Sequence, residues 1–216
     1  MEKSIFEENF IHCLNTNFPR FSKYFDYQYR VFFELNTSIF EVTKCQILEL
    51  HQASITLTNN ILERLLKLAL INNEVGIRPI PTEKWNLIFK EADRKYSSLS
   101  LGNSIEACKK NGLLTKEDSD FLFGTIRELM RNGFAHADPG KILSELPDEA
   151  IMFQVSLTNP KDLKEVHLNQ KTIPILQSIQ IGNFAKANSS IYLDYVFSLL
   201  IRLESHLVEK NQSFNS

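Results

Sequence analysis

Residues 61–70, ILERLLKLAL, are the part of this chain that most strongly indicates its fold. Leu, Ala, Glu, Arg and Lys are good helix formers, and the 56 residues 20–75 contain neither glycine nor proline. Such a gap favours long helices. One helical stripe recurs through it at steps of three and four: Ile47, Leu50, Ser54, Leu57, Ile61, Leu65 and Leu68. We therefore predict one long helix, straight or bent, from about 36 to 72.

Capping and stop signals predict further helices on the C-terminal side of this one. A helix should begin after Pro81 with Thr82 as its cap, and a shorter one should end at Gly112. The sequence TKED at 115–118 resembles a capping box. It should open a helix with Leu122, Ile126 and Leu129 on one face, and Pro139-Gly140 should end that helix.

The composition changes after this helix. The segments IMFQVSLT (151–158) and KEVHLNQKTIPILQSIQI (164–181) are rich in β-branched residues, with a turn signal at Asn159-Pro160. We predict a β-rich appendage over about 150–182, in which one or two short strands form a small hairpin or flap. A last helix over 189–210 should follow, with Ser189 or Ser190 as its cap. The fold class predicted is therefore all-α: a helical bundle with a small β-rich appendage before the C-terminal helix.

Length and composition predict one soluble domain spanning residues 1–216. The net charge is -2 and the pI is about 6.2, so no global field attracts the protein to nucleic acid or to a membrane. The three cysteines, Cys13, Cys45 and Cys108, are far apart and lack CxxC spacing, which favours free thiols in a reducing compartment. The first residues do not resemble a signal peptide, and no apolar run is long enough to cross a bilayer. We expect a cytoplasmic location.

The candidate functional residues lie in RELMRNGFAHAD, residues 127–138. On an α-helix Asn132 and His136 are about 40° apart and share a face, whereas Arg131 and His136 diverge by about 140°. Either the helix loosens near Gly133, or a second copy of the helix supplies the complementary group across a dimer axis. Glycine permits both arrangements, because it allows close backbone approach.

These residue types suit RNA cleavage without a metal ion. Arginine offers a planar fork of donors that matches phosphate oxygens. Histidine exchanges protons near neutral pH, and asparagine can orient either group or hold a ribose hydroxyl. The sequence has no HExxH motif and no clustered carboxylates, so we predict neither a metal nor a cofactor. An arginine and a histidine on one helix are also typical of a salt-bridged surface pair or of satisfied core groups, and spacing alone does not separate these interpretations.

The run RNGFAH resembles the R-x4-6-H signature of the HEPN superfamily, the higher eukaryote and prokaryote nucleotide-binding domains. The preceding SLGNSIEACKKNGLLTKEDSDFLFGTIRELM is similar to that family's short helix, break and motif helix. LTNNILERLLKLALI, with Glu63, is similar to its long helix. The resemblance covers about residues 40–138 well and the last helix loosely. It implies a helical bundle that dimerises with two motif helices facing each other, and a composite cleft holding Arg131, Asn132 and His136 from both chains.

Many members of that superfamily are metal-independent ribonucleases in toxin–antitoxin, phage-defence or RNA-processing systems, so RNA and an antitoxin are expected partners. In relatives controlled by a nucleotidyltransferase antitoxin, a tyrosine lies two residues after the histidine, whereas this chain has Asp138. Asp138 would repel phosphate unless it pairs with an arginine such as Arg127. Two alternatives stay open: a non-catalytic HEPN module that binds RNA, nucleotide or a protein, and a plain helical interaction protein.

Two other features have simpler interpretations. Residues 18–33 hold eight aromatics interleaved with Arg20, Lys23 and Arg30, which suits base stacking but more often reflects core packing. Glu63 would either reach the cleft or pair with an arginine. The remaining histidines have no partner at metal-ligand spacing and are expected at the surface or satisfied in the core: His12, His51, His167 and His206.

Overall fold

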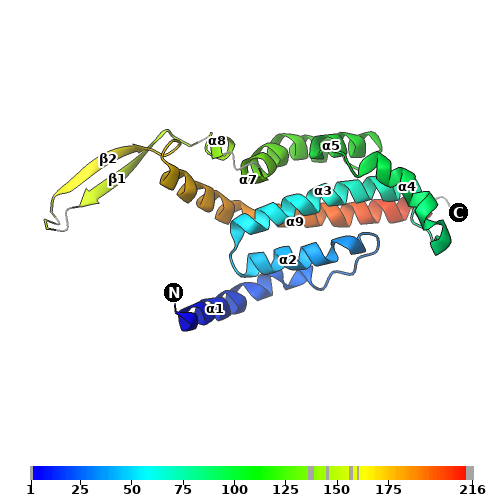
Figure 1. Ribbon diagram of the computed structural model, residues 1–216, viewed down its shortest axis with the longest axis horizontal. Helices are drawn as coiled ribbons and strands as arrows, with labels where there is room; N and C mark the ends of the chain where they lie inside the picture. The colour runs from blue at the N-terminus through cyan, green and yellow to red at the C-terminus, as the bar shows by residue number, and fades with distance from the viewer. Residues whose placement is uncertain (1, 136–138, 145, 156–157, 160, 213–216) are drawn as a thin grey trace.

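The computed structural model describes residues 2–135, 139–144, 146–155, 158–159 and 161–212, and it is mostly helical with one small antiparallel sheet. The predicted helical class with a β appendage is confirmed at this level. In Figure 1 the helices stack in three tiers. Helices α1 (Lys3–Phe21) and α2 (Asn36–Ile47) form one outer tier, and α3 (His51–Val75) with α9 (Pro174–Gln212) forms the middle tier.

The single helix predicted over 36–72 is wrong, because the chain reverses between α2 and α3. Leu50 N donates to Cys45 O at 2.8 Å and Glu49 N donates to Gln46 O at 3.2 Å, the bond pair of a Schellman motif. Glu49 takes the left-handed position, φ 57°, where glycine is usual. Asn17 of α1 secures the turn by donating to Ile47 O at 3.0 Å. The turn carries no glycine signal, so the helical periodicity of the sequence continues through it.

Helix α3 forms the centre of the core. Most of the predicted stripe is buried, but Leu50 is 51% exposed at the turn. The apolar residues of α3 are buried on more than one side, as expected for a helix surrounded by others. α3 packs against α2, α4, α5 and α9. The buried apolar residues of α3 are Ile55, Ile61, Leu62, Leu65, Leu66, Leu68, Ala69, Leu70 and Ile71.

A buried carboxylate ties the aromatic segment 18–33 to α9. Glu204 is fully buried and accepts hydrogen bonds from the amides of Arg30, Val31 and Phe32 at 2.8–3.0 Å and from the Tyr27 hydroxyl at 2.6 Å. Short 3-10 turns, η1 (Ser22–Tyr24) and η2 (Phe33–Leu35), flank this loop. The core-packing interpretation holds for these buried aromatics: Phe21, Tyr24 and Phe32.

The second outer tier contains α4 (Trp85–Tyr96), α5 (Leu101–Lys110) and α6 (Lys116–Phe121). Thr82 does not cap α4, because it begins a separate 3-10 turn, η3 (Thr82–Lys84). The stop at Gly112 is confirmed by its left-handed φ of 71° just beyond α5. The cap predicted at TKED is confirmed too, since Thr115 Oγ1 accepts from Asp118 N at 3.0 Å.

The segment after α6 is a π-helix, η4 (Leu122–Asn132), followed by α7 (Gly133–Ala135) and α8 (Pro139–Ile142). Leu122 and Ile126 are buried as predicted, and Met130, four residues further on, is buried with them. The side chain of Leu129 lies outside what the structure describes. Pro139-Gly140 do not end the helical stretch, because both residues lie within α8.

The predicted hairpin is confirmed: β1 (Glu149–Val155) pairs antiparallel with β2 (Leu163–Asn169), from Glu149↔Asn169 to Val155↔Leu163. It projects away from the bundle at the start of α9 (Figure 1). The β-rich interpretation is wrong after residue 173, because α9 begins at Pro174. Its β-branched residues suggested a strand, but a proline in the first turn suits a helix start. Ser189 and Ser190 are therefore interior to α9, not caps.

Candidate functional site

The motif lies where η4 passes into α7. Arg131 and Asn132 are the last two residues of η4, and Gly133 is the first residue of α7. His136 and Asp138 lie outside the described residues, as do the side-chain positions of Arg131 and Asn132. The approach of Arg131 to His136, and the pairing of Asp138 with Arg127, therefore remain predictions.

The helix that carries the motif is wound more loosely than an α-helix. π-helical turns bond each residue to the one five positions on, are rare, and are frequent at functional sites. The sequence predicted loosening near Gly133 as one way to bring Arg131 and His136 together. The loosened winding lies on the N-terminal side of that glycine and ends at Asn132. Gly133 itself is buried and α-helical.

A buried polar chain fixes the backbone immediately before Arg131. Asn59 Nδ2, on α3, donates to Met130 O at 3.1 Å, and the Tyr192 hydroxyl, on α9, donates to Asn59 Oδ1 at 2.8 Å. All three residues are at most 6% exposed. Burying an amide side chain requires that its groups be hydrogen-bonded, and here both ends of Asn59 are. Three elements thus meet at the residue that precedes the motif.

Sequence reasoning missed Asn59, although a signal was present. Asn59 and Asn60 stand side by side within a strongly apolar helix, and asparagine is a poor helix-interior residue that competes for backbone bonds. Asn60 is exposed and Asn59 is buried. A polar side chain on the buried stripe of a core helix indicates a specific partner.

Glu63 lies one helical turn beyond Asn59 and is half-buried. Burial raises the pKa of the Tyr192 hydroxyl far above its ordinary value, and the Glu63 carboxylate raises it further. Tyr192 therefore stays protonated and keeps donating to Asn59. Glu63 also takes part in a further interaction, so both of its predicted roles stay open.

Phe134, the residue after Gly133, packs against the C-terminal helix α9. The Phe134 ring packs against Phe184 of α9 with ring centroids 6.0 Å apart. Phe134 is half-buried against the core, whereas Met130 is buried on α3. The motif is therefore held on both sides, by α3 before it and by α9 after it.

An aromatic–cationic ridge runs along η4 toward the motif. The Arg127 guanidinium lies over the Phe123 ring, 4.5 Å from its centroid, and Phe123 is 39% exposed. A Cβ at Gly102 of α5 would lie 3.6 Å from Phe123, so α5 closely approaches this ridge. A groove of about 260 Å³ runs beside it, with Asn103 and Glu106 in its wall. Arginine stacked on an aromatic ring suits contact with phosphate and base together.

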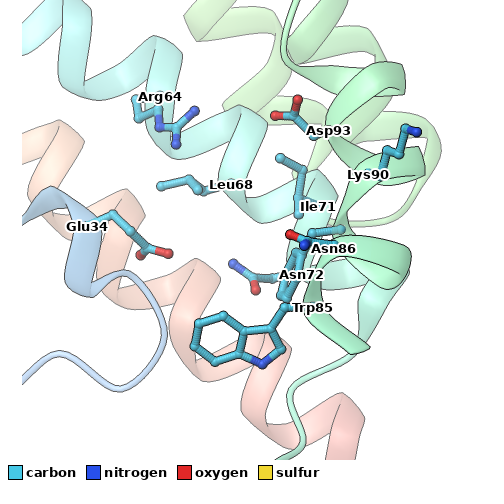
Figure 2. A pocket seen from close by; sticks show the side chains of 10 residues that line it. Glu34, Arg64, Leu68, Ile71, Asn72, Trp85, Asn86, Lys90 and Asp93 are labelled. Atoms are coloured by element: carbon cyan, nitrogen blue, oxygen red, sulfur yellow. The ribbon is translucent and has the colours of Figure 1, made fainter. Parts of the chain in front are cut away.

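A larger cavity, about 660 Å³, lies away from the motif between α3 and α4. Figure 2 shows Glu34, Arg64, Asn72 and Trp85 around it. It combines carboxylates with cations, and neither histidine nor cysteine contributes to its lining. The cavity has no general acid–base pair of the histidine type and no thiol nucleophile, so its size alone does not make it a catalytic centre.

Metal and thiol chemistry receive no support from the described part of the chain. Among residues 2–135 and the later described segments, no group of three His, Cys, Asp or Glu side chains is placed to hold a metal ion. Burial raises the pKa of the Cys108 thiol to about 12 and also raises that of Cys45. Cys108 is therefore a protonated core group.

Two of the remaining histidines lie beside polar side chains. His51 is half-buried, with Nδ1 3.0 Å from Ser189 Oγ, and His167 lies on the exposed hairpin between Glu149 and Glu165. Within the described residues, no helix is both long enough and apolar enough to cross a bilayer.

No family model, characterised protein or solved structure matches this chain.

Proposed function

We propose that this protein is a metal-independent RNA endonuclease of the HEPN kind, acting in a toxin–antitoxin or phage-defence system. The observation that carries the proposal is the placement of Arg131 and Asn132 at the end of a π-helix whose backbone is fixed to the core through Asn59. A catalytic side chain must be held rigidly to act. A merely solvated arginine needs no such support.

The proposed reaction is an internal transesterification. The ribose 2′-oxygen forms a bond to the adjacent phosphorus while the bond from that phosphorus to the 5′-oxygen breaks. His136 accepts the proton of the 2′-hydroxyl, and a protonated His136 returns one to the departing 5′-oxygen. Arg131 stabilises the charge that develops on the phosphoryl oxygens. Asn132 orients one of these groups. The products are a 2′,3′-cyclic phosphate and a 5′-hydroxyl.

The active form in this proposal is a homodimer with η4 and α7 at the interface. On a straight α-helix Arg131 and His136 diverge by about 140°, and a two-fold related helix offers the complementary group. Sedimentation should give a mass of at least two chains at micromolar concentration. A monomer that cleaves RNA would overturn this part of the proposal while leaving the chemistry intact.

The second candidate is a non-catalytic HEPN module that binds RNA, nucleotide or a protein. Two observations favour it: Asp138 follows the motif, and the chain carries a net charge of -2. Both weaken attraction for phosphate. The cleavage assay separates the two candidates, because a binding module retains RNA without cutting it.

The decisive assay uses labelled single-stranded RNA in EDTA. Wild type should cut it, and His136→Ala should lower the rate by about 10²–10⁴-fold. His206→Ala, at an exposed position of α9, is the matched control and should cut as wild type does. Substrate carrying a 2′-deoxyribose at the cleavage position should resist. Cutting of the deoxy substrate, or activity only with added metal, contradicts the mechanism. RNA binding without cutting favours the second candidate.

A further inference from the structure

The outer side of α1 exposes a row of large apolar side chains. Phe6, Phe10 and Phe18 are 59%, 44% and 44% exposed, and Leu14 between them is 37% exposed. Phe40 of α2 extends the row and is 45% exposed. We name these five residues the α1 face. Contiguous exposed apolar surface of this kind marks a site of association.

The α1 face contains an apolar groove of about 530 Å³ between α1 and α2. Phe25 closes its floor, with its ring centroid 6.0 Å from that of Phe18 and 5.2 Å from that of Phe40. Lys44 is the single charged side chain in its lining. The groove therefore suits apolar side chains from an opposing surface, with one cation at its edge.

The charges around the groove suit another copy of the same surface. Lys44 Nζ lies 4.1 Å from the Phe40 ring centroid and has no ionic partner among the described residues. Glu7 lies one turn before Phe10 on the same side of α1, and within the described part of the chain its ion pair is with exposed Lys3, at 3.2 Å. Two α1 helices packed antiparallel would bring each Glu7 toward the Lys44 of the other copy.

The available apolar area agrees with such a pairing. A phenylalanine buries roughly 150–250 Å² in full, so the four half-exposed phenylalanines of the α1 face offer on the order of 100 Å² each. Together they supply about half of the roughly 800 Å² that each partner buries in a standard interface. The rest would come from Leu14 and from neighbouring exposed residues such as Ile11, which is 54% exposed. An anionic membrane fits less well, since Glu2, Glu7 and Glu8 outnumber Lys3 at this end of α1.

We propose that the α1 face binds a second copy of this chain, with the two α1 helices antiparallel about a two-fold axis near Leu14. Helix α1 lies on the opposite side of the α3–α9 tier from α5 and α7 (Figure 1). It is thus separate from the dimer contact proposed for the motif and does not depend on the proposed ribonuclease function. A protein that has both contacts assembles beyond a dimer.

Sedimentation velocity tests the contact. The chain concentration should run from roughly 1 to 50 µM, a range that covers micromolar dissociation constants. Phe10→Asp and Phe18→Asp should each give a smaller assembly than the wild type. A wild type larger than a dimer should become a dimer, and a dimeric wild type should become a monomer. Both positions are exposed in the single chain, so circular dichroism should be unchanged. Leu87→Asp on α4, 78% exposed and away from the α1 face, is the matched control and should retain the wild-type mass.

A charge exchange tests the antiparallel arrangement. Glu7→Lys and Lys44→Glu should each raise the dissociation constant of this contact by about tenfold, and the double variant should restore it. A monomeric wild type, or a mass unaffected by Phe10→Asp, overturns the proposal. A double variant no tighter than either single variant overturns the pairing of Glu7 with Lys44. Binding of the monomeric wild type to phosphatidylglycerol vesicles would instead assign the face to a membrane.

Discussion

Asn59 on α3 donates a 3.1 Å hydrogen bond to the main-chain oxygen of Met130, 71 positions further along the chain. Replacing Asn59 by alanine should destabilise the fold by about 1–3 kcal/mol, because it removes the bond to the buried Met130 carbonyl and leaves the buried Tyr192 hydroxyl without its Asn59 acceptor. Asn60→Ala, on the exposed side of the same helix, is the control and should cost little. Urea denaturation of both variants measures the difference. An equal loss of unfolding free energy in the two variants would mean that the Asn59–Met130 hydrogen bond makes no specific contribution to stability.

The same change connects stability to the proposed reaction. If Asn59 positions the backbone before Arg131, Asn59→Ala should lower the RNA-cleavage rate even at temperatures where the variant is fully folded. Tyr192→Phe keeps Asn59 in place and removes only its second bond, so it should destabilise by about 1 kcal/mol and retain more activity. A fully active, folded Asn59→Ala variant would show that the anchor serves stability alone.

Arg131→Lys should rescue cleavage poorly compared with the wild type. Lysine keeps the charge but loses the planar fork that meets two phosphoryl oxygens at once. Arg131→Ala should lower the rate by about 10²–10³-fold, and Arg131→Lys should remain within about tenfold of that value. Single-turnover cleavage in EDTA measures both. Near wild-type rates for the lysine variant would indicate that charge alone suffices.

Glu204→Ala should destabilise the protein more than any surface change, by at least about 3 kcal/mol. It leaves three main-chain amides and the Tyr27 hydroxyl of the loop before α2 without their acceptor. Glu204→Gln should cost less, because the amide oxygen still accepts from the main chain. The exposed Glu209→Ala, on the same helix, is the control, and chemical denaturation ranks all three.

Glu49→Gly should stabilise the protein by about 0.5–1 kcal/mol, because Glu49 has φ 57°, which disfavours any residue with a Cβ atom. The same substitution at exposed Glu41, in the middle of α2, should have the opposite sign and cost about 1 kcal/mol. Thermal unfolding of the two variants checks the turn between α2 and α3. A destabilised Glu49→Gly variant would show that the hydrogen bond from Asn17 Nδ2 to Glu49 Oε1, 3.3 Å long, outweighs the backbone strain.

The imidazole of His51 should make stability depend on pH between about 5 and 7. Burial is the main cause that lowers its pKa, and Lys186 lowers it too, whereas Glu49 opposes them. The unfolded chain, with a pKa near 6.5, then binds more protons than the folded chain in the window below 6.5. The unfolding free energy therefore rises with pH there, and this contribution is lost as pH falls.

Urea midpoints at two pH values on either side of this window measure the effect. His51→Gln should lose less stability on acidification than the wild type does. His206→Gln, at an exposed position, should keep the wild-type dependence. Identical slopes for wild type and His51→Gln would assign the pH dependence to other groups.

The parts of the fold that local chemistry controls could be predicted from the sequence. The Thr115 cap, the Gly112 stop and the antiparallel hairpin depend on a few neighbouring residues, and each is confirmed. The turn at Glu49 could not be predicted, because its left-handed residue is not glycine and the bonds that secure it come partly from Asn17 of another helix. The start of α9 at Pro174 differs from the prediction, because the β-branched residues around this position favour a strand.

The candidate site, too, could be predicted only in part from the sequence. Sequence pattern identified the motif and the helix that precedes it, with Leu122 and Ile126 on the buried side. The role of Asn59 depends on which carbonyl lies opposite it in three dimensions, and no spacing within one helix contains that information. The π-helical winding of η4 could not be predicted either, since its residues are individually compatible with an α-helix.

Because η4 is π-helical, the geometry next to the motif depends on the number of residues in η4. A π-helix holds more residues per turn than an α-helix, so a change of η4 to α-helical winding could absorb the deletion of one residue. A Cβ added at Gly124 would meet no atom within 4 Å, and deletion of this glycine would remove nothing from the core. With Met130 held beneath Asn59, deletion of Gly124 would turn Phe123 by about 100° relative to Arg127 and the motif. A change of one residue in the length of η4 would thus separate the stacked Phe123 and Arg127 without altering any residue of the motif.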